Sequence, residues 1–309
     1  MPRIRSAIWL VVMYSLLLWP VALASADPSS AQAADGPPGD LFGSVNGGVG
    51  NGLAAVYQYT PAGLQSTFAA GLSRARGLAF DSLGNLLVAT TFCEAICSAT
   101  ILKIAPDGAQ SVFGKLPTSY FGEGVAIDLS GSVFVIAINN ASTQSMIFQF
   151  TPDGLRRPFA LLRGQSFDLA FDSAGSLFAA GSTSIYKYAP DGTRSIFVGP
   201  EAFAPFEGPQ GLAFDAFGNL FVSTRGFPFN NDRIYKFTPS AVQSTFATGL
   251  AFPRGVAFDS AGNLFVAESP LSTAGDILKY TPDGAHSVFA SGIGDPEGRG
   301  GPEFLTVQP

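Results

Sequence analysis

The sequence predicts an all-β chain that forms a six-bladed β-propeller of four-stranded antiparallel blades, with the ring closed by the C-terminal strand joining the first blade. Three observations predict this fold. A repeat of about forty-five residues recurs along the chain, which is typical of propellers. Glycine and proline account for 36 and 22 of the 309 residues, as expected for many short strands joined by tight turns. Finally, the two ends of the chain each supply part of one blade.

The first half of each repeat predicts two antiparallel strands with a turn between them. It reads GLAFDSLGNLLVAT from Gly77, GVAIDLSGSVFVIA from Gly124, DLAFDSAGSLFAAG from Asp168, GLAFDAFGNLFVST from Gly211 and GVAFDSAGNLFVAE from Gly255. Apolar, β-branched and aromatic residues fill both strands, and the DSxGN-type turn reverses the chain. The turn aspartates are 47, 44, 43 and 44 residues apart, which is the regularity of one repeated unit.

The second half of each repeat predicts the outer pair of strands. Its copies are ILKIAPDGAQSVF, MIFQFTPDGLRRPF, IYKYAPDGTRSIF, RIYKFTPSAVQSTF and ILKYTPDGAHSVF. In most copies the turn is PDG, in which proline fixes φ and glycine accepts a positive φ. Each repeat therefore completes a four-stranded blade.

The two ends of the chain complete one composite blade. The sequence from Gly39 matches the second strand of a repeat and continues through VYQYTPAGLQSTF, with no first strand before it. The C-terminal EFLTVQP supplies that strand, with Leu305 and Val307 standing where Leu78 and Phe80 stand. Joining the ends hides the sheet edges that an open array would expose. Five internal copies and this composite blade make six.

Residues 1–26 predict a signal peptide. Arg3 and Arg5 form a basic start, residues 7–18 are mainly apolar, and Ala24, Ser25 and Ala26 form a small-residue cleavage site. The alternative, an uncleaved membrane anchor, is disfavoured because the apolar run is short for a bilayer span. Residues 27–38 form a flexible lead-in and residues 39–309 the propeller. We therefore expect an exported protein, periplasmic or extracellular, with no membrane insertion after cleavage.

Composition and cysteine usage narrow the function classes. The formal net charge is −6 and the basic residues are scattered, so the chain has no footprint for nucleic acid. Cys93 and Cys97 are the only cysteines, and in an oxidising compartment they are expected to form a small structural disulfide. The only histidine is His286, on an outer strand, so no Ser-His-acid arrangement is predicted and no catalytic residue is assigned. We expect a monomer.

The motif GLAFDSxGNLFVA followed by IYKYTPDG resembles the NHL repeats and the related gluconolactonase-type (senescence-marker-protein) propellers. The resemblance covers everything after Gly39 and implies the six-bladed fold, whereas these families include both enzymes and binding scaffolds. The aspartate that often ends the second strand in NHL repeats is replaced here by Thr90, Ala137, Gly181, Thr224 and Glu268. The gluconolactonase resemblance also implies a calcium ion held over the channel by acidic and amide side chains.

One position before the innermost strand of each blade is expected to surround the mouth of the central channel. Around the ring these residues are Arg76, Glu123, Phe167, Gln210, Arg254 and Glu303. The four charged ones are contiguous and alternate in sign, so this arc should largely neutralise itself and oppose a calcium ion. Three interpretations stay open: charge pairing alone, an arginine that clamps a carboxylate or sugar acid, and a metal held by Glu123, Glu207 or Glu303.

The same face carries the long loops, where we place any ligand site. Several aromatic residues fall in its connections: Phe92, Tyr120, Phe203, Phe206, Phe227 and Phe229. Such clusters mark partner surfaces, although some of these rings are expected to pack beneath their own loops.

Two functions from different classes follow. The first is an exported non-catalytic binding propeller, without a cofactor, whose long-loop face docks a protein, a glycan or a small acidic ligand. The alternative is a metal-dependent lactone hydrolase of the gluconolactonase type, for which calcium would be the cofactor.

Overall fold

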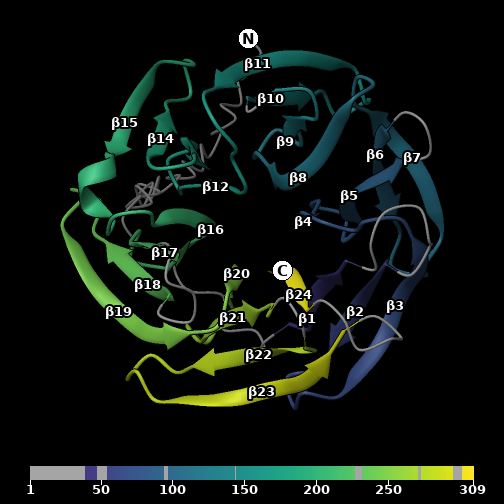
Figure 1. Ribbon diagram of the computed structural model, residues 1–309. Coiled ribbons are helices and arrows are strands. Elements are labelled where there is room, and N and C mark those ends of the chain that lie inside the picture. Colours follow the sequence, from purple (N-terminus) through teal and green to yellow (C-terminus); the bar gives the residue numbers. More distant parts are fainter. Residues whose placement is uncertain are drawn as a thin grey trace, which may run out of the picture. The chain divides into compact units, whose positions relative to one another are not determined.

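The computed structural model describes residues 39–46, 54–93, 97–142, 144–226, 232–270, 273–294 and 301–309. These residues form six four-stranded antiparallel sheets arranged as blades around a central axis (Figure 1), which confirms the predicted fold. The chain divides into two compact units, residues 1–32 and 33–309, and all described residues belong to the second. The predicted signal peptide and lead-in therefore lie outside the described residues.

Each blade runs from an innermost to an outermost strand. The composite blade contains β24 (Pro302–Val307), β1 (Leu41–Val45), β2 (Ala54–Tyr59) and β3 (Gln65–Leu72). The second blade contains β4 (Leu78–Phe80), β5 (Leu86–Cys93), β6 (Cys97–Ile104) and β7 (Gln110–Lys115). The third contains β8 (Tyr120–Ile127), β9 (Val133–Asn139), β10 (Ser145–Phe150) and β11 (Arg156–Leu162). The fourth contains β12 (Leu169–Phe171), β13 (Leu177–Ala180), β14 (Ile185–Tyr188) and β15 (Arg194–Val198), which a short 3-10 helix, η1 (Pro200–Ala202), follows. The fifth contains β16 (Gly208–Phe214), β17 (Leu220–Arg225), β18 (Asp232–Phe237) and β19 (Gln243–Leu250). The sixth contains β20 (Pro253–Phe258), β21 (Leu264–Glu268), β22 (Gly275–Tyr280) and β23 (His286–Ile293).

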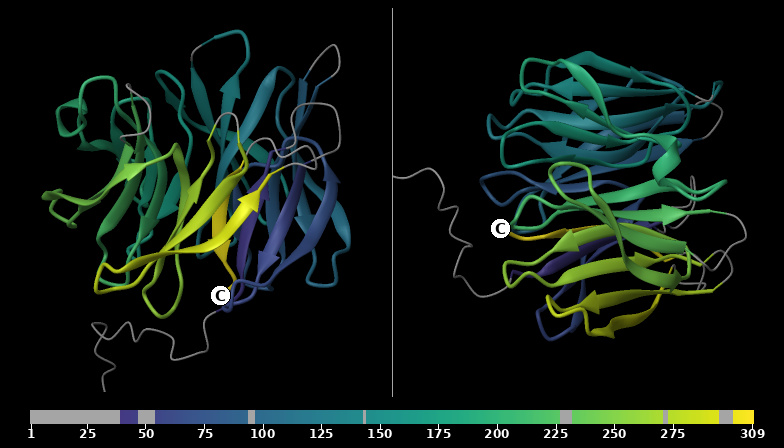
Figure 2. Two further views of the ribbon diagram at one scale, coloured as in Figure 1. Left: turned by 60° about the horizontal axis from the view of Figure 1, so that its bottom comes forward. Right: turned by 90° about the vertical axis from the view of Figure 1, so that its left-hand side faces the viewer.

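The C-terminal strand β24 closes the ring as predicted. It pairs antiparallel with β1, with Leu305 opposite Gly43 and Val307 opposite Leu41. Figure 2 shows the C-terminal end of β24 at one face of the propeller, where the tight turns lie. The longer connections lie at the opposite face, which we call the loop face.

The turn aspartates explain why the inner hairpins recur so faithfully. In the second blade the Oδ1 of Asp81 accepts hydrogen bonds from the backbone amides of Leu83 at 3.0 Å and Asn85 at 2.8 Å. Gly84 follows with φ +77°, which glycine adopts without steric cost. Asp128, Asp172 and Asp215 make the same pair of contacts in their own turns.

The core lies between neighbouring blades, where aromatic rings interlock. Phe134 on β9 meets Phe171 on β12 with ring centroids 5.3 Å apart, in an edge-to-face arrangement. The same contact recurs from blade to blade at 4.9 to 5.0 Å, in the pairs Phe42–Phe80, Phe178–Phe214 and Phe221–Phe258. The inner-strand phenylalanines are thus core residues, because edge-to-face packing stabilises the contact between blades.

The innermost strands approach one another closely around the channel. The amide of Gly77 donates to the backbone oxygen of Glu123 at 3.2 Å, and the amide of Gly124 donates to that of Phe167 at 2.9 Å. A Cβ on Gly77 would lie 2.3 Å from the Glu123 oxygen, so only glycine fits there. The register of β8 with β9 shifts between Gly122 and Val125, which takes Glu123 out of the regular ladder at the channel mouth.

Candidate functional site: an arginine-rich pocket at the channel mouth

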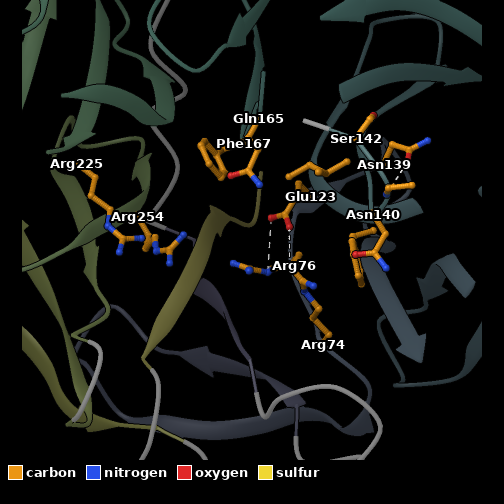
Figure 3. Close-up of a pocket in the computed structure, with 13 residues that line it drawn as sticks. Arg74, Arg76, Glu123, Asn139, Asn140, Ser142, Gln165, Phe167, Arg225 and Arg254 are labelled. Carbon is orange, nitrogen blue, oxygen red and sulfur yellow. Dashed lines mark hydrogen bonds and ion pairs between the residues drawn. The ribbon is translucent and has the colours of Figure 1, made fainter. Parts of the chain in front are cut away.

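A pocket of about 550 Å³ opens at the channel mouth on the loop face (Figure 3). Its charged lining consists of Arg74, Arg76, Arg225, Arg254 and Glu123. Asn139 at the end of β9 and Asn140 and Ser142 in the loop after it supply polar groups on one side. Gln165 and Phe167 come from the next blade. Residues from several blades therefore converge on one concave site, which is where propeller loops hold ligands.

The predicted arc of alternating charges exists as a chain of ion pairs. The Nη1 of Arg76 donates to the Oε2 of Glu303 at 2.5 Å, and its Nε lies 3.5 Å from the Oε2 of Glu123. The Nε of Arg254 lies 3.5 Å from the same oxygen of Glu303. The alternation in sequence thus corresponds to pairing in space, across blades that are far apart along the chain.

Two arginines that the repeat alignment did not single out also line the pocket, Arg74 and Arg225. Arg74 donates from Nη2 to the Oε1 of Glu123 at 2.9 Å, and its guanidinium lies 4.6 Å from the ring centre of Phe121. Arg225 ends β17, with its guanidinium 4.7 Å from the ring centre of Phe252. Arg74 and Arg225 therefore add two positive charges beside the four residues of the predicted arc.

Guanidinium groups outnumber carboxylates in this pocket. Among the described residues, four arginines line it and Glu123 is the only carboxylate that does so. Glu303 lies beneath, and Asp232 lies behind Arg225 with its carboxylate accepting the backbone amides of Gly226 at 2.8 Å and Phe252 at 3.3 Å. With both of these acids counted, the described residues of the site still carry one more positive than negative charge, which attracts anions.

Arg225 and Arg254 lie next to each other at the pocket wall (Figure 3). Burial and the neighbouring charge of Arg254 lower the pKa of Arg225, while Asp232 and Glu303 raise it. Among the described residues, the Nε of Arg254 has no hydrogen-bond acceptor. Two like charges side by side repel each other, and an anion between them relieves that repulsion.

The charge state of Glu303 follows from its surroundings. Burial by itself would raise its pKa, but Arg76 and Arg254, and more weakly Arg74 and Arg225, lower the pKa below its usual range. Burial likewise acts to lower the pKa of Arg76, and Glu123 and Glu303 outweigh it, so that the pKa is raised. Glu303 is therefore an anion that holds the arginines in place, and it is poorly suited to serve as a general base.

The channel below the mouth is narrow. A space of about 10 Å³ is left between Glu123, Phe167, Gln210, Arg254, Glu303 and their neighbours. The amide Nε2 of Gln210 donates to the backbone oxygen of Pro209 at 3.1 Å, so this side chain folds back on its own strand. This space is too small for any ligand much larger than a water molecule.

Glu207, one of the residues considered for a metal, holds the backbone of its own loop. It accepts hydrogen bonds from the hydroxyl of Thr224, from the backbone amide of Ala204 at 3.0 Å and from the hydroxyl of Tyr235 at 3.3 Å. Arg233 lies 3.7 Å from it. Its carboxylate oxygens are thus already satisfied by the protein.

The predicted donors do not fit a calcium ion. Glu123 and Glu303 each contact two guanidinium groups. Within the described ranges, no three His, Cys, Asp or Glu side chains gather where they could hold a metal ion. A hard dication takes six or more oxygen ligands, and adjacent guanidinium groups oppose it.

The loop-face aromatics divide into core and exposed residues. Phe203 is only 7% exposed and packs on Tyr235 directly after η1, so it is one of the rings that pack beneath their own loop. Tyr120 begins strand β8 instead of lying in a loop, and packs edge-to-face on Phe148. Phe92 is 44% exposed and Phe206 87% exposed. Phe227 and Phe229 lie outside the described residues.

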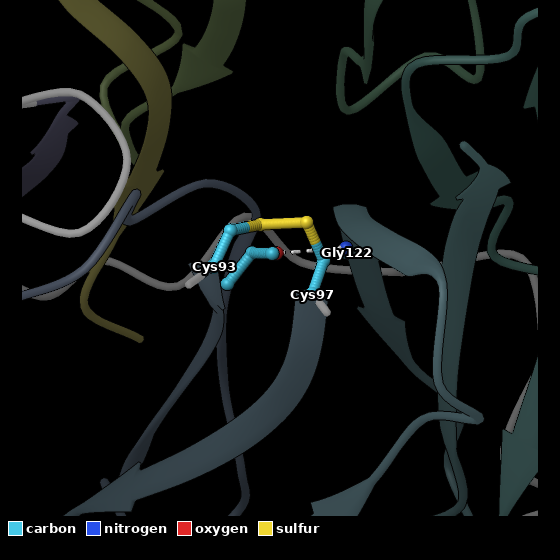
Figure 4. Close-up of a disulfide and its surroundings, with 4 residues drawn as sticks. Cys93, Cys97 and Gly122 are labelled. Atoms are coloured by element: carbon cyan, nitrogen blue, oxygen red, sulfur yellow. Dashed lines mark hydrogen bonds between the residues drawn. A yellow bond between two sulfur atoms is a disulfide. The ribbon is translucent and has the colours of Figure 1, made fainter. Parts of the chain in front are cut away.

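Cys93 and Cys97 form the predicted disulfide (Figure 4). They face each other at the ends of β5 and β6, so the bond joins two strands that are already paired. Next to it the amide of Gly122 donates to the hydroxyl of Thr91 at 3.2 Å, which ties this hairpin to the neighbouring blade. His286 begins β23, the outermost strand of its blade, where it stacks on Tyr280.

Comparison with solved structures places this fold among known propellers. A gluconolactonase from Xanthomonas campestris is 17% identical, with a TM-score of 0.56 over 72% of this chain and 77% of that one. Virginiamycin B lyase from Staphylococcus aureus is 18% identical, with a TM-score of 0.53 over 74% and 73%. A protein from Lactobacillus plantarum is 14% identical, with a TM-score of 0.55 over 87% and 99%. No protein-family model and no curated protein matches the chain.

At these identities the comparisons establish the fold alone. The expected resemblance to gluconolactonase-like and NHL-type propellers is confirmed at that level. The enzymes among these neighbours have different activities on one architecture, so the fold does not select an activity. In the part of the chain that the structure describes, no helix has the length and hydropathy to cross a bilayer.

Proposed function

We propose that this chain is an exported, non-catalytic binding propeller that takes a small acidic ligand, of the sugar-acid class, at the channel mouth. The observation that carries the proposal is the paired placement of Arg225 and Arg254 at a pocket of about 550 Å³ where arginines outnumber acids. Planar guanidinium groups bind carboxylates through two parallel hydrogen bonds, which gives both affinity and orientation.

The opposite wall supports a ligand that carries hydroxyl groups beside its carboxylate. Asn139, Asn140 and Ser142 line the pocket across from Arg225 and Arg254, and Asn140 and Ser142 are exposed. Amide and hydroxyl side chains both donate and accept hydrogen bonds, so they match sugar hydroxyls. A hydroxylated carboxylic acid is thus the ligand class that satisfies both walls.

The binding interpretation requires no metal and no general base. The glutamates at the mouth are engaged by arginines, and the sole histidine stacks on an outer strand. The ion pairs therefore serve to hold a cationic surface in a fixed geometry, which lowers the cost of ordering it when an anion binds. Export is part of the proposal, and it rests on the N-terminal sequence and on a disulfide that suits an oxidising compartment.

Calorimetric titration of the purified protein tests this function. Glucuronate is the probe, and glucose, which has the same ring without the carboxylate, is its control. We expect glucuronate to bind and glucose not to bind, with affinity that falls as salt is raised because the contact is ionic. Equal binding of the two sugars, or binding of neither, would contradict the proposal.

A further inference from the structure

A second pocket lies beside the channel mouth on the same face. It measures about 570 Å³ and is lined by Ser182, Thr183, Phe206, Gln210 and Arg225, together with the backbone around η1. Arg225 lines this pocket and the first one, so the two share a wall. Arg225 is therefore the residue that a ligand occupying both pockets would contact from each.

Phe206 at the edge of this pocket has an unusual backbone conformation. Its φ is +64°, and the amide of Glu207 donates to the backbone oxygen of Ala204 at 3.0 Å. With Pro205 at the second position, this is a type II turn, whose third position ordinarily holds glycine. A side chain with a Cβ is strained there, because the Cβ comes too close to the following carbonyl oxygen.

Burial does not compensate for this strain, because Phe206 is 87% exposed. The turn itself is firmly anchored on both sides. Phe203 is buried against Tyr235 and Phe237, and the carboxylate of Glu207 is held by hydrogen bonds to Thr224, Tyr235 and Ala204. The fold thus presents an aromatic ring to solvent on a rigid loop, and strained, over-determined residues of this kind concentrate at ligand sites.

The chemistry of the pocket indicates a sugar ring. The face of an aromatic ring carries partial negative charge and attracts the C–H groups on the apolar face of a pyranose. Ser182 and Thr183, both exposed, supply hydroxyl groups for the polar edge of the same ring. Aromatic face and hydroxyl groups together match a carbohydrate better than a purely apolar ligand.

We propose that the pocket beside Phe206 is a second subsite, which binds the neighbouring sugar ring of an acidic saccharide whose carboxylate is held at the channel mouth. This inference rests on the proposed function and names its ligand more closely: an acidic saccharide of at least two rings. Because Arg225 lines both pockets, the ring that carries the carboxylate would lie at the mouth and the neighbouring ring would lie against Phe206.

The test compares glucuronate with glucuronosyl-galactose, which carries the same single charge and one additional neutral ring. Calorimetric titration of the wild-type protein should give tighter binding of the disaccharide. Phe206→Ala and Phe206→Gly should each remove that gain, by roughly two- to tenfold in Kd, and leave glucuronate binding unchanged. Phe217→Ala is the matched control, because Phe217 is 85% exposed and lies at the opposite, tight-turn face.

The glycine variant separates binding from folding. Because glycine is the favoured residue at this turn position, Phe206→Gly should have a Tm equal to or above that of the wild type while its disaccharide affinity falls. If glucuronate binds but the disaccharide binds no tighter, or if the gain survives in both Phe206 variants, the second subsite is disproved and the mouth site stands. If glucuronate itself fails to bind, the proposed function and this inference both fail.

Discussion

Arg76 and Glu303 join the second blade to the C-terminal strand through one hydrogen bond. The Nη1 of Arg76 donates to the Oε2 of Glu303 at 2.5 Å, although the two residues are 227 positions apart in sequence. Glu303 belongs to the C-terminal strand that completes the first blade, and Arg76 precedes the innermost strand of the second. The contact therefore stabilises ring closure and also holds a guanidinium at the mouth of the proposed site.

Replacing Glu303 should destabilise the protein strongly. Glu303→Gln leaves the buried Arg76 and the neighbouring Arg254 without their shared carboxylate, and breaking a buried ion pair from one side typically costs about 3 kcal/mol or more. Chemical unfolding of the variant measures the loss in free energy. Glu201→Gln, at an exposed position on η1, is the control and should leave stability unchanged. Equal stability of the two variants would show that the ion pair does not hold the ring.

The buried carboxyl group of Asp168 should make the free energy of unfolding decrease as pH rises. Burial raises its pKa from 3.8 to about 7, although the backbone amides of Leu212 and Leu169 donate to its carboxylate and act in the opposite direction. The folded state thus binds the proton more tightly than the unfolded state does. Its contribution to stability is complete below about pH 4 and is lost progressively between pH 4 and 7, on the order of a few kcal/mol.

The difference between the wild type and Asp168→Asn isolates this effect, because all other titrating groups are common to both proteins. The free energy of unfolding of the wild type, relative to the variant, should decrease across that pH range. A constant difference, or one that increases with pH, would mean that Asp168 is ionised in the folded protein throughout.

Reduction of the disulfide should change little. Cys93 and Cys97 are four positions apart and join strands that already pair, so the bond restricts a very short loop. The chain-entropy model gives such a ring at most about 2 kcal/mol. Thermal melting with and without a thiol-free reductant measures the effect. Loss of the cooperative transition on reduction would show that this hairpin controls folding of the whole propeller.

Calcium and chelators should leave the Tm unchanged. The glutamates at the mouth are paired with arginines, and packing between blades supplies the core. Melting curves with calcium chloride and with EDTA test this, since any ligand that prefers the folded state raises the Tm. A clear stabilisation by calcium would restore the lactone hydrolase alternative.

The repeat pattern was sufficient to predict the blades, their number and the closing strand. Each internal hairpin carries its own turn residues, and four inner strands carry an aromatic core residue, namely Phe80, Phe171, Phe214 and Phe258. The repeat pattern also predicted the alternation of Arg254, Glu303, Arg76 and Glu123, since these occupy one aligned position. The sequence shows that Asp168 occupies a position that holds glycine in the other internal repeats. Its burial and raised pKa could not be predicted, because they depend on contacts with the neighbouring blade.

Other features of the site have no counterpart in the repeat. Arg74 and Arg225 lie outside the aligned position: Arg74 reaches the pocket from the connection between β3 and β4, and Arg225 from the end of β17. The left-handed conformation of Phe206 contradicts the residue preference of its turn, so local sequence rules predict the wrong residue there. Phe203 and Phe206 are three positions apart, yet Phe203, directly after η1, is buried in the core and Phe206 is exposed to solvent.

Titration of glucuronate into the Arg254→Gln variant tests the central claim most directly. Arg254 lines the pocket beside Arg225, and the glutamine keeps a polar side chain of similar reach without the charge. Arg194→Gln, at an exposed position on an outer strand, is the control. We expect the wild type and Arg194→Gln to bind glucuronate alike, and Arg254→Gln to bind about tenfold more weakly or worse, as expected for loss of a charge-assisted hydrogen bond. Undiminished affinity in Arg254→Gln, with its fold intact, would contradict the claim that the arginines at the channel mouth form the anion site.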